Sequence, residues 1–232
     1  NNGILDQSVI LLNSSNRSSL FFIDCKTLEY KNICPEKKIN FGILVVHSGI
    51  NRVLLNTNYN ERVKECLIVA KKILELAGEQ VKEDVKLRDV PREYFEKFKD
   101  KLPENLRKRG QHFYSEMERV EKGIGYWRKG DMVNFGELIK MSGESSIKNY
   151  ECGIPETIYL QKILNSIPEI YGSRFSGAGF GGSCIGLIKE GIEKEKIIEN
   201  IGKKYLCKFP YLKDKYKIIF TKHGRAPEII NF

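Results

Sequence analysis

The sequence lacks the features that would mark a zinc protein, a disulfide-stapled domain or a membrane protein. No two cysteines form a C-x-x-C pair, no apolar run approaches about 18 residues, and no segment is repeated or of low complexity. The three histidines, His47, His112 and His223, have no partner at a catalytic or metal-binding spacing, and we assign them no chemistry. The cysteines are therefore expected to be free thiols of a cytoplasmic protein, with no metal site: Cys25, Cys34, Cys66, Cys152, Cys184 and Cys207.

Composition predicts a self-stabilised fold with a mostly solvated basic surface. Of the 232 residues, 41% are hydrophobic, which is enough for a sizeable core, and we expect residues 1–232 to form one domain. The formal charge of +9 comes from 39 basic and 30 acidic residues dispersed along helix faces such as "KKILE". Dispersed charge steers anions but specifies no partner, and the chain lacks the interleaved aromatic and basic residues of a nucleic-acid surface. We therefore expect neither nucleic acid nor membrane as a partner.

The order of the predicted elements indicates an α+β fold. Apolar residues recur every three or four positions from 57 to 77 and again after Pro103, which predicts two long amphipathic helices. Strands before and after a block of helices, without regular βαβ alternation, favour helices packed on a largely antiparallel sheet. Further helices are expected from Asp6 and in 131–150, 155–167 and 193–209, and strands in 19–25, 27–33, 41–49, 183–189 and 215–221, the first two joined by a very short connection at Lys26.

The stretch "RFSGAGFGGSCIGLI", residues 174–188, is dense in glycine. Glycine costs roughly 0.5–1 kcal/mol relative to alanine in regular structure, so this cluster needs a tight turn or a close backbone approach. Gly177, Gly179 and Gly182 match G-x-G-x-x-G, but a dinucleotide site needs a strand before that pattern and a helix after it. Here a helix end and a turn are expected in 164–174, and a strand follows. An anion-binding turn and a ligand-free turn both remain open.

Several motifs in the same order resemble the galactokinase-type sugar kinases of the GHMP superfamily. "SRFSGAGFGGSCIGLI" is similar to the third motif of that family, and "GILDQ" to its catalytic-aspartate motif. Other similar stretches are "FIDCKTLEY" for a hairpin, "SGINR" and "NYNERVKEC" for the strand and helix that reach the sugar, and "RKRGQHFYSEMERV" and "SSIKNYECGIPE" for helical segments. The resemblance runs from Gly3 to about Phe220 and covers the C-terminal part of such an enzyme.

The resemblance implies transfer of the ATP γ-phosphate to the C1 hydroxyl of galactose, with Mg²⁺. Asp6 matches the carboxylate taken as the catalytic base, and Gly3 and Tyr59 match contacts to the sugar. Arg52 lies near a basic position beside the catalytic carboxylate, although Asn51 stands where the family often has a second basic residue. The loop that closes the site near the phosphates and the sugar matches Gly177, Ala178, Gly179, Phe180, Gly181 and Gly182.

These residue types suit phosphoryl transfer, which mainly asks the protein to hold the attacking hydroxyl in line and to offset charge. A carboxylate with an ordinary pKa of about 4 can orient that hydroxyl and take its proton late. The structural alternatives are a helix cap for Asp6 and a packing aromatic for Tyr59. The resemblance also implies that Asp6 and the glycine loop form opposite walls of one cleft.

Two family motifs are absent from the sequence, namely the N-terminal sugar-binding cluster and the phosphate loop. We therefore expect the N-terminal half of the same enzyme to be a partner that holds most of the ATP and Mg²⁺, and expect these 232 residues alone to be inactive. Galactose is the first candidate sugar. Galacturonate is the second, because "NGILDQS", "NYECG" and Ser142-Gly143 look more like plant-type galacturonate kinases. A non-catalytic sugar sensor of the same fold is the alternative of another class, and the intact Asp6 argues against it.

Overall fold

A four-stranded antiparallel sheet is the centre of the fold. The computed structural model describes residues 4–12, 19–51 and 59–222, and the sheet has the strand order β4-β5-β3-β6. Its strands are β3 (Gly42–His47), β4 (Ile170–Phe175), β5 (Ser183–Ile188) and β6 (Lys217–Thr221), and every neighbouring pair is antiparallel. Together with the helices this confirms the predicted α+β class.

One face of the sheet carries the largest core. Alternate strand residues, among them Leu44, Val46 and Cys184, point toward α6 (Pro155–Asn165) and α7 (Lys194–Lys208) and are fully buried. The helices meet them with apolar residues at helical spacing: Leu160, Ile163, Leu164, Ile197, Ile201 and Tyr205. At about 25 cal/mol per Å² of apolar surface, this burial is the main force that holds helices and sheet together.

On the other face, α5 (Met132–Lys148) packs against β4 at very short range. A Cβ atom on Gly172 would lie 1.9 Å from the carbonyl oxygen of Gly136, so both backbones need glycine there. Of the helix end and turn predicted in 164–174, the helix end is confirmed at Asn165 and turn residues follow, but the prediction is wrong for 170–174, because residues 170–175 form β4. Gly172 and Ser173 weaken the strand signal, and only contact with α5 shows why they are there.

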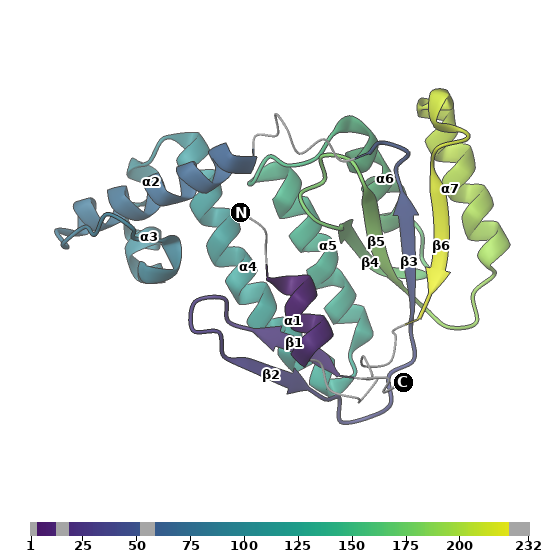
Figure 1. The fold of residues 1–232 in the computed structure, drawn as a ribbon, viewed down its shortest axis with the longest axis horizontal. Coiled ribbons are helices and arrows are strands. Elements are labelled where there is room, and N and C mark those ends of the chain that lie inside the picture. Colours follow the sequence, from purple (N-terminus) through teal and green to yellow (C-terminus); the bar gives the residue numbers. More distant parts are fainter. Residues whose placement is uncertain (1–3, 13–18, 52–58, 223–232) are drawn as a thin grey trace, which may run out of the picture.

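A helical arm extends from the sheet, formed by α2 (Tyr59–Ala77), α3 (Arg92–Phe98) and α4 (Glu104–Lys129) (Figure 1). The predicted helices 57–77 and that after Pro103 are confirmed over the described residues, and Gly78 follows α2 with a φ of +76°. Helix α3 was not predicted. It closes a second apolar cluster whose buried members include Val69, Ile73, Phe95, Leu106 and Tyr114.

The predicted hairpin is present as β1 (Leu20–Ile23) and β2 (Tyr30–Ile33), paired antiparallel. The connection is longer than expected, because residues 24–29 lie outside both strands. The Asp24 carboxylate accepts hydrogen bonds from the N–H groups of Lys26 and Thr27, at 2.8 and 3.4 Å, and ends the pairing early. Beside the hairpin a third cluster buries Ile33, Ile39, Trp127 and Met132.

Helix α1 (Leu5–Leu12) lies over α4 and α5 in Figure 1. The short helix expected from Asp6 is therefore confirmed, but none of its residues is buried, and Leu11 is 77% exposed. All six cysteines are free, and burial raises the pKa of Cys184 to about 12. No helix in the described ranges is long and apolar enough to cross a membrane.

Candidate functional site

The glycine-rich segment forms the turn between β4 and β5, which we call the glycine turn (residues 177–182). Four of its six residues have positive φ: Gly177 at 98°, Gly179 at 76°, Gly181 at 97° and Gly182 at 78°. The residues between, Ala178 and Phe180, do not. Alternating signs of φ let successive N–H groups converge on one side, which is the geometry of a backbone anion nest.

The glycine turn is fixed to the fold by its inner residues. Gly182 donates its N–H to Ile50 O at 2.8 Å, and its own carbonyl accepts from Ser48 N at 2.8 Å. The carbonyl of Gly179 accepts from Ile154 N at 3.2 Å and from the hydroxyl of buried Thr157 at 2.6 Å. Sequence reasoning missed Thr157, because nothing in "PETIY" separates an inward hydroxyl from an ordinary first-turn threonine.

Its outer side remains available for a ligand. Gly177 is exposed and Ala178 and Phe180 are partly exposed, whereas the other three residues are buried. Within the described part of the chain, the N–H groups of residues 177–181 donate to no protein acceptor. Unpaired N–H groups beside a buried backbone are costly, so this arrangement favours an external acceptor such as a phosphate oxygen.

A buried aromatic ring supports the turn from below. Phe175, which is 2% exposed, lies between two glycines with positive φ. A Cβ on Gly179 would lie 2.4 Å from its Cδ2 atom, and a Cβ on Gly153 would lie 2.8 Å from its Cζ atom. Both Cβ positions lie close to the Cε2 atom of the ring, at 2.6 and 3.0 Å, so the ring couples the turn to the segment before α6.

The other predicted site residues are only partly described. Asp6 lies exposed in the first turn of α1, and Tyr59 is the first residue of α2. Gly3, Arg52 and the side chain of Tyr59 lie outside the described residues. No hydrogen bond or ion pair of the described residues joins Asp6 to the glycine turn. That they line one cleft therefore stays a prediction.

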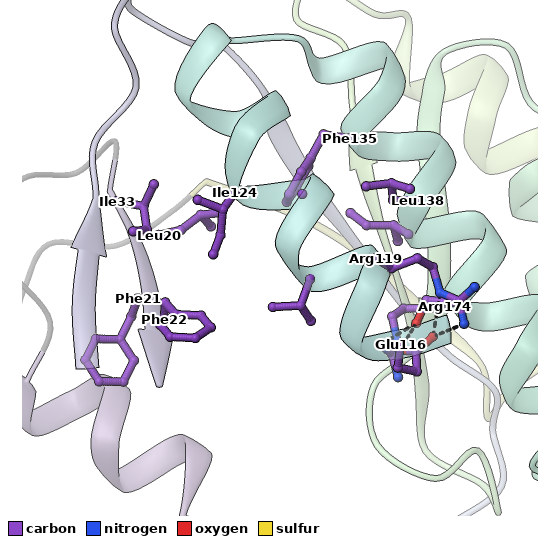
Figure 2. Close-up of a pocket in the computed structure, with 14 residues that line it drawn as sticks. Leu20, Phe21, Phe22, Ile33, Glu116, Arg119, Ile124, Phe135, Leu138 and Arg174 are labelled. Atoms are coloured by element: carbon purple, nitrogen blue, oxygen red, sulfur yellow. Dashed lines mark hydrogen bonds and ion pairs between the residues drawn. The ribbon is translucent and has the colours of Figure 1, made fainter. Parts of the chain in front are cut away.

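A separate apolar cavity lies between the β1–β2 hairpin and helices α4 and α5 (Figure 2). Its volume is about 240 Å³, and neither Asp6 nor the glycine turn lines it. At one end the Glu116 carboxylate accepts hydrogen bonds from Arg119 Nε and Ser142 Oγ, both at 2.7 Å. Arg174 Nη1 donates to the same serine at 2.8 Å. The remaining wall is apolar: Leu20, Phe21, Phe22, Ile33, Val120, Ile124, Phe135, Leu138 and Ile139.

A buried ion-pair cluster joins α2, α4 and the segment after α5. The fully buried Arg109 donates from Nε to Glu65 at 2.6 Å and from Nη2 to Glu151 at 2.7 Å. Hydrogen bonding to Arg109 lowers the pKa of Glu151 below its usual range. Burial alone would raise the pKa of Glu65, but hydrogen bonds from Arg109 and Arg62 lower it overall. Sequence reasoning missed this cluster, because "RKRGQ" resembles a solvated helix face.

His112 on α4 makes packing and hydrogen-bond contacts to α5 and to the segment that follows it. His112 Nδ1 lies 2.9 Å from Ser145 Oγ, and its ring stacks on Tyr150 with centroids 4.7 Å apart. Burial lowers the pKa of His112 to about 4, so it is neutral at pH 7. This agrees with assigning it no acid–base chemistry from the sequence.

Comparison with known proteins gives the family. Residues 122–206, which include α5, α6, both strands of the glycine turn and most of α7, match the family described as GHMP kinases C terminal. Over these residues the chain is similar to the C-terminal domain of GHMP kinases. The resemblance drawn from the sequence motifs is thereby confirmed.

Relatives that match this chain are sugar kinases. It is 46% identical to a galacturonokinase of Arabidopsis thaliana over 189 residues, 81% of this chain and 44% of that protein. It is 33% identical to a galactokinase of Thermotoga neapolitana over 221 residues, 95% of this chain and 56% of that protein. The chain thus spans about half the length of the curated relatives it matches. A crystal structure of Lactococcus lactis galactokinase complexed with galactose superimposes with a TM-score of 0.80 at 26% identity, over 97% of this chain and 55% of that one.

The glycine turn offers backbone donors of the kind that bind phosphate. The unpaired N–H groups of the glycine turn match phosphate oxygens. In contrast, no group of three His, Cys, Asp or Glu side chains gathers in the described ranges as a metal site. We therefore derive no step through Mg²⁺ from these residues.

Proposed function

We propose that this chain is part of an ATP-dependent sugar kinase that phosphorylates the C1 hydroxyl of a galactose-type sugar. The observation that carries the proposal is the glycine turn, whose N–H groups from 177 to 181 have no acceptor among the described residues. Backbone donors held in place before the reaction stabilise developing phosphate charge without reorganisation. The sugar-kinase relatives support the same chemistry.

Asp6 is the proposed catalytic base. The C1 oxygen attacks the γ-phosphorus, a new O–P bond forms, and the bond to the β-phosphate oxygen breaks to release ADP. The hydroxyl proton passes to the Asp6 carboxylate. Asp6 is exposed in the first turn of α1, where solvent and a ligand can both reach it. Tyr59 and Gly3 are proposed to contact the sugar, and Arg52 to lie beside Asp6.

The acceptor is proposed to be galactose or its C6 acid. Galactose was the first expectation from the sequence. Galacturonate is the second candidate, and the higher identity to a galacturonokinase, 46% against 33% for the galactokinase named above, favours it. We also propose that the 232 residues alone turn over neither sugar, because the sugar-binding and phosphate-loop motifs are absent from them.

The test uses the full-length product of the gene that encodes this chain, with ATP and Mg²⁺ and either galactose or galacturonate. ADP release with one of them, and none with the 1-deoxy sugar, is the expected result. Asp6→Asn should lower kcat by about 100-fold or more, as expected for loss of a group that acts mainly in the transition state. Its affinity for the sugar, measured by calorimetry, should change less than about threefold.

Asp84→Asn is the matched control, because Asp84 is an exposed aspartate far along the chain from α1. It should retain full activity. Full turnover by Asp6→Asn would remove Asp6 as the base. Absence of transfer to both sugars by the unmodified full-length protein would refute the kinase proposal and favour a sugar sensor.

A further inference from the structure

We propose that Arg109 and Glu151 are positioning residues that hold the glycine turn in its working geometry. The inference rests on the proposed phosphoryl transfer for its catalytic consequence, but its structural part stands alone. Neither residue is one to which the sequence motifs gave a role.

The argument begins with the backbone of Glu151. Its φ is +54°, a conformation that L-residues other than glycine, asparagine and aspartate rarely adopt. Such a residue persists only where its surroundings over-determine it, and these conformations cluster at functional sites. The backbone on both sides of Glu151 bonds back to the end of α5, Tyr150 N to Ser145 O and Cys152 N to Ser146 O, both at 3.0 Å, and the Glu151 side chain adds a further contact that holds this conformation.

The Glu151 side chain forms a hydrogen-bonded ion pair with Arg109. Nη2 of Arg109 donates to one carboxylate oxygen at 2.7 Å, and Lys108 Nζ lies 3.4 Å from the other. Arg109 itself cannot move, since it also donates to Glu65 at 2.6 Å and to the Asn149 carbonyl at 2.6 Å. Both ends of the segment 149–151 are therefore fixed to a guanidinium with 0% side-chain exposure.

From Glu151 the chain leads directly to the glycine turn. Gly153, two residues on, packs against the Phe175 ring, and Ile154 donates its N–H to the Gly179 carbonyl at 3.2 Å. Three residues later the Thr157 hydroxyl donates to the same carbonyl at 2.6 Å. Loss of the Arg109–Glu151 contact would free the segment that supports Gly179 from below.

The same cluster reaches the start of α2. Arg62 Nη1 pairs with Glu65 and lies 3.8 Å from the Glu151 carboxylate, and Arg62 stands three residues after Tyr59. The cluster thus ties the helix start proposed to contact the sugar to the turn proposed to contact phosphate.

The principal variant is Glu151→Gln, which keeps the shape of the side chain and removes its charge. Amide hydrogen exchange should rise at least about tenfold at Ile154 and Gly182, whose N–H groups donate to Gly179 O and Ile50 O, while the sheet strands and α7 keep their protection. In the full-length protein kcat should fall about tenfold, with the KM for sugar within about threefold. Glu137→Gln is the matched control: it removes an exposed pair with Lys140 at 3.3 Å on α5, which shares no partner with Arg109 or Glu151, and should change neither quantity.

The outcomes separate this inference from the kinase proposal. Unchanged exchange at Ile154 and Gly182 in Glu151→Gln, or a uniform rise over the whole chain, overturns it. If the full-length protein proves to be no kinase, the exchange result still decides whether the cluster holds the turn. Arg109→Lys is the second variant. If it fails to fold, Glu151→Gln keeps the test intact, because the Glu151 side chain is 41% exposed and is less central to the core.

Discussion

Alanine at Gly179 should destabilise the protein more than alanine at Gly78, although both glycines have a φ of +76°. A non-glycine residue in this region costs about 1–2 kcal/mol, and this cost is common to both variants. Around Gly78 nothing lies within 4 Å of the added Cβ. At Gly179 the Cβ would lie 2.4 Å from Phe175 Cδ2 and 2.6 Å from its Cε2.

The Phe175 ring has little room to move aside, because it is 2% exposed and Gly153 also packs against it. Overpacking of this kind costs about 1–3 kcal/mol. We therefore expect Gly78→Ala to lose about 1 kcal/mol of unfolding free energy and Gly179→Ala about 2–4 kcal/mol.

Urea unfolding of the two variants in parallel measures the difference, since the shared cost of positive φ cancels. In the full-length protein Gly179→Ala should also lose kinase activity under conditions where it is folded, and Gly78→Ala should not. Equal destabilisation of the two variants, within about 0.5 kcal/mol, would refute the packing argument.

Three further predictions concern buried groups. The pKa of His112 is about 4 in the folded state against an ordinary 6.5, so its contribution to stability is complete above pH 6.5 and is lost as the pH drops toward 4. The loss of unfolding free energy at pH 5 should be about 2 kcal/mol. Urea unfolding at each pH measures it, and it should disappear in His112→Gln. Thr157→Val should cost about 1–2 kcal/mol by removing the hydroxyl that donates to Gly179 O, whereas Thr157→Ser should retain most of the stability; equal losses would exclude the hydrogen bond as the cause. Leu160→Ala should cost about 2–5 kcal/mol at a position with 0% exposure, and a loss below about 1 kcal/mol in thermal unfolding would contradict its place in the core.

Local signals in the chain were strong enough to specify most of the elements. The spacing of apolar residues located α2, α4, α5, α6 and α7, because a helix that buries one face must repeat every three to four residues. The β-branched runs located β3, β5 and β6 in the same way. The glycine turn was also visible, since several consecutive positive φ angles leave little choice but glycine.

Features that depend on partners distant in the chain were not visible. Strand β4 was not predicted, because its Gly172 is required by the close approach of Gly136 on α5 and not by any local preference for a strand. Helix α3 likewise depends on packing in the second apolar cluster. The connection between β1 and β2 is shaped by hydrogen bonds to the Asp24 side chain.

The sequence by itself determined the class of fold, most of its elements and the position of a glycine turn, because each depends on neighbours within one or two turns of chain. Only the tertiary structure decided that Arg109 is buried, that Glu151 holds a left-handed backbone, and that Thr157 and Phe175 support Gly179. The physical reason is that burial and charge pairing depend on which segments meet in space, and the same arginine would be an ordinary surface residue on an isolated helix.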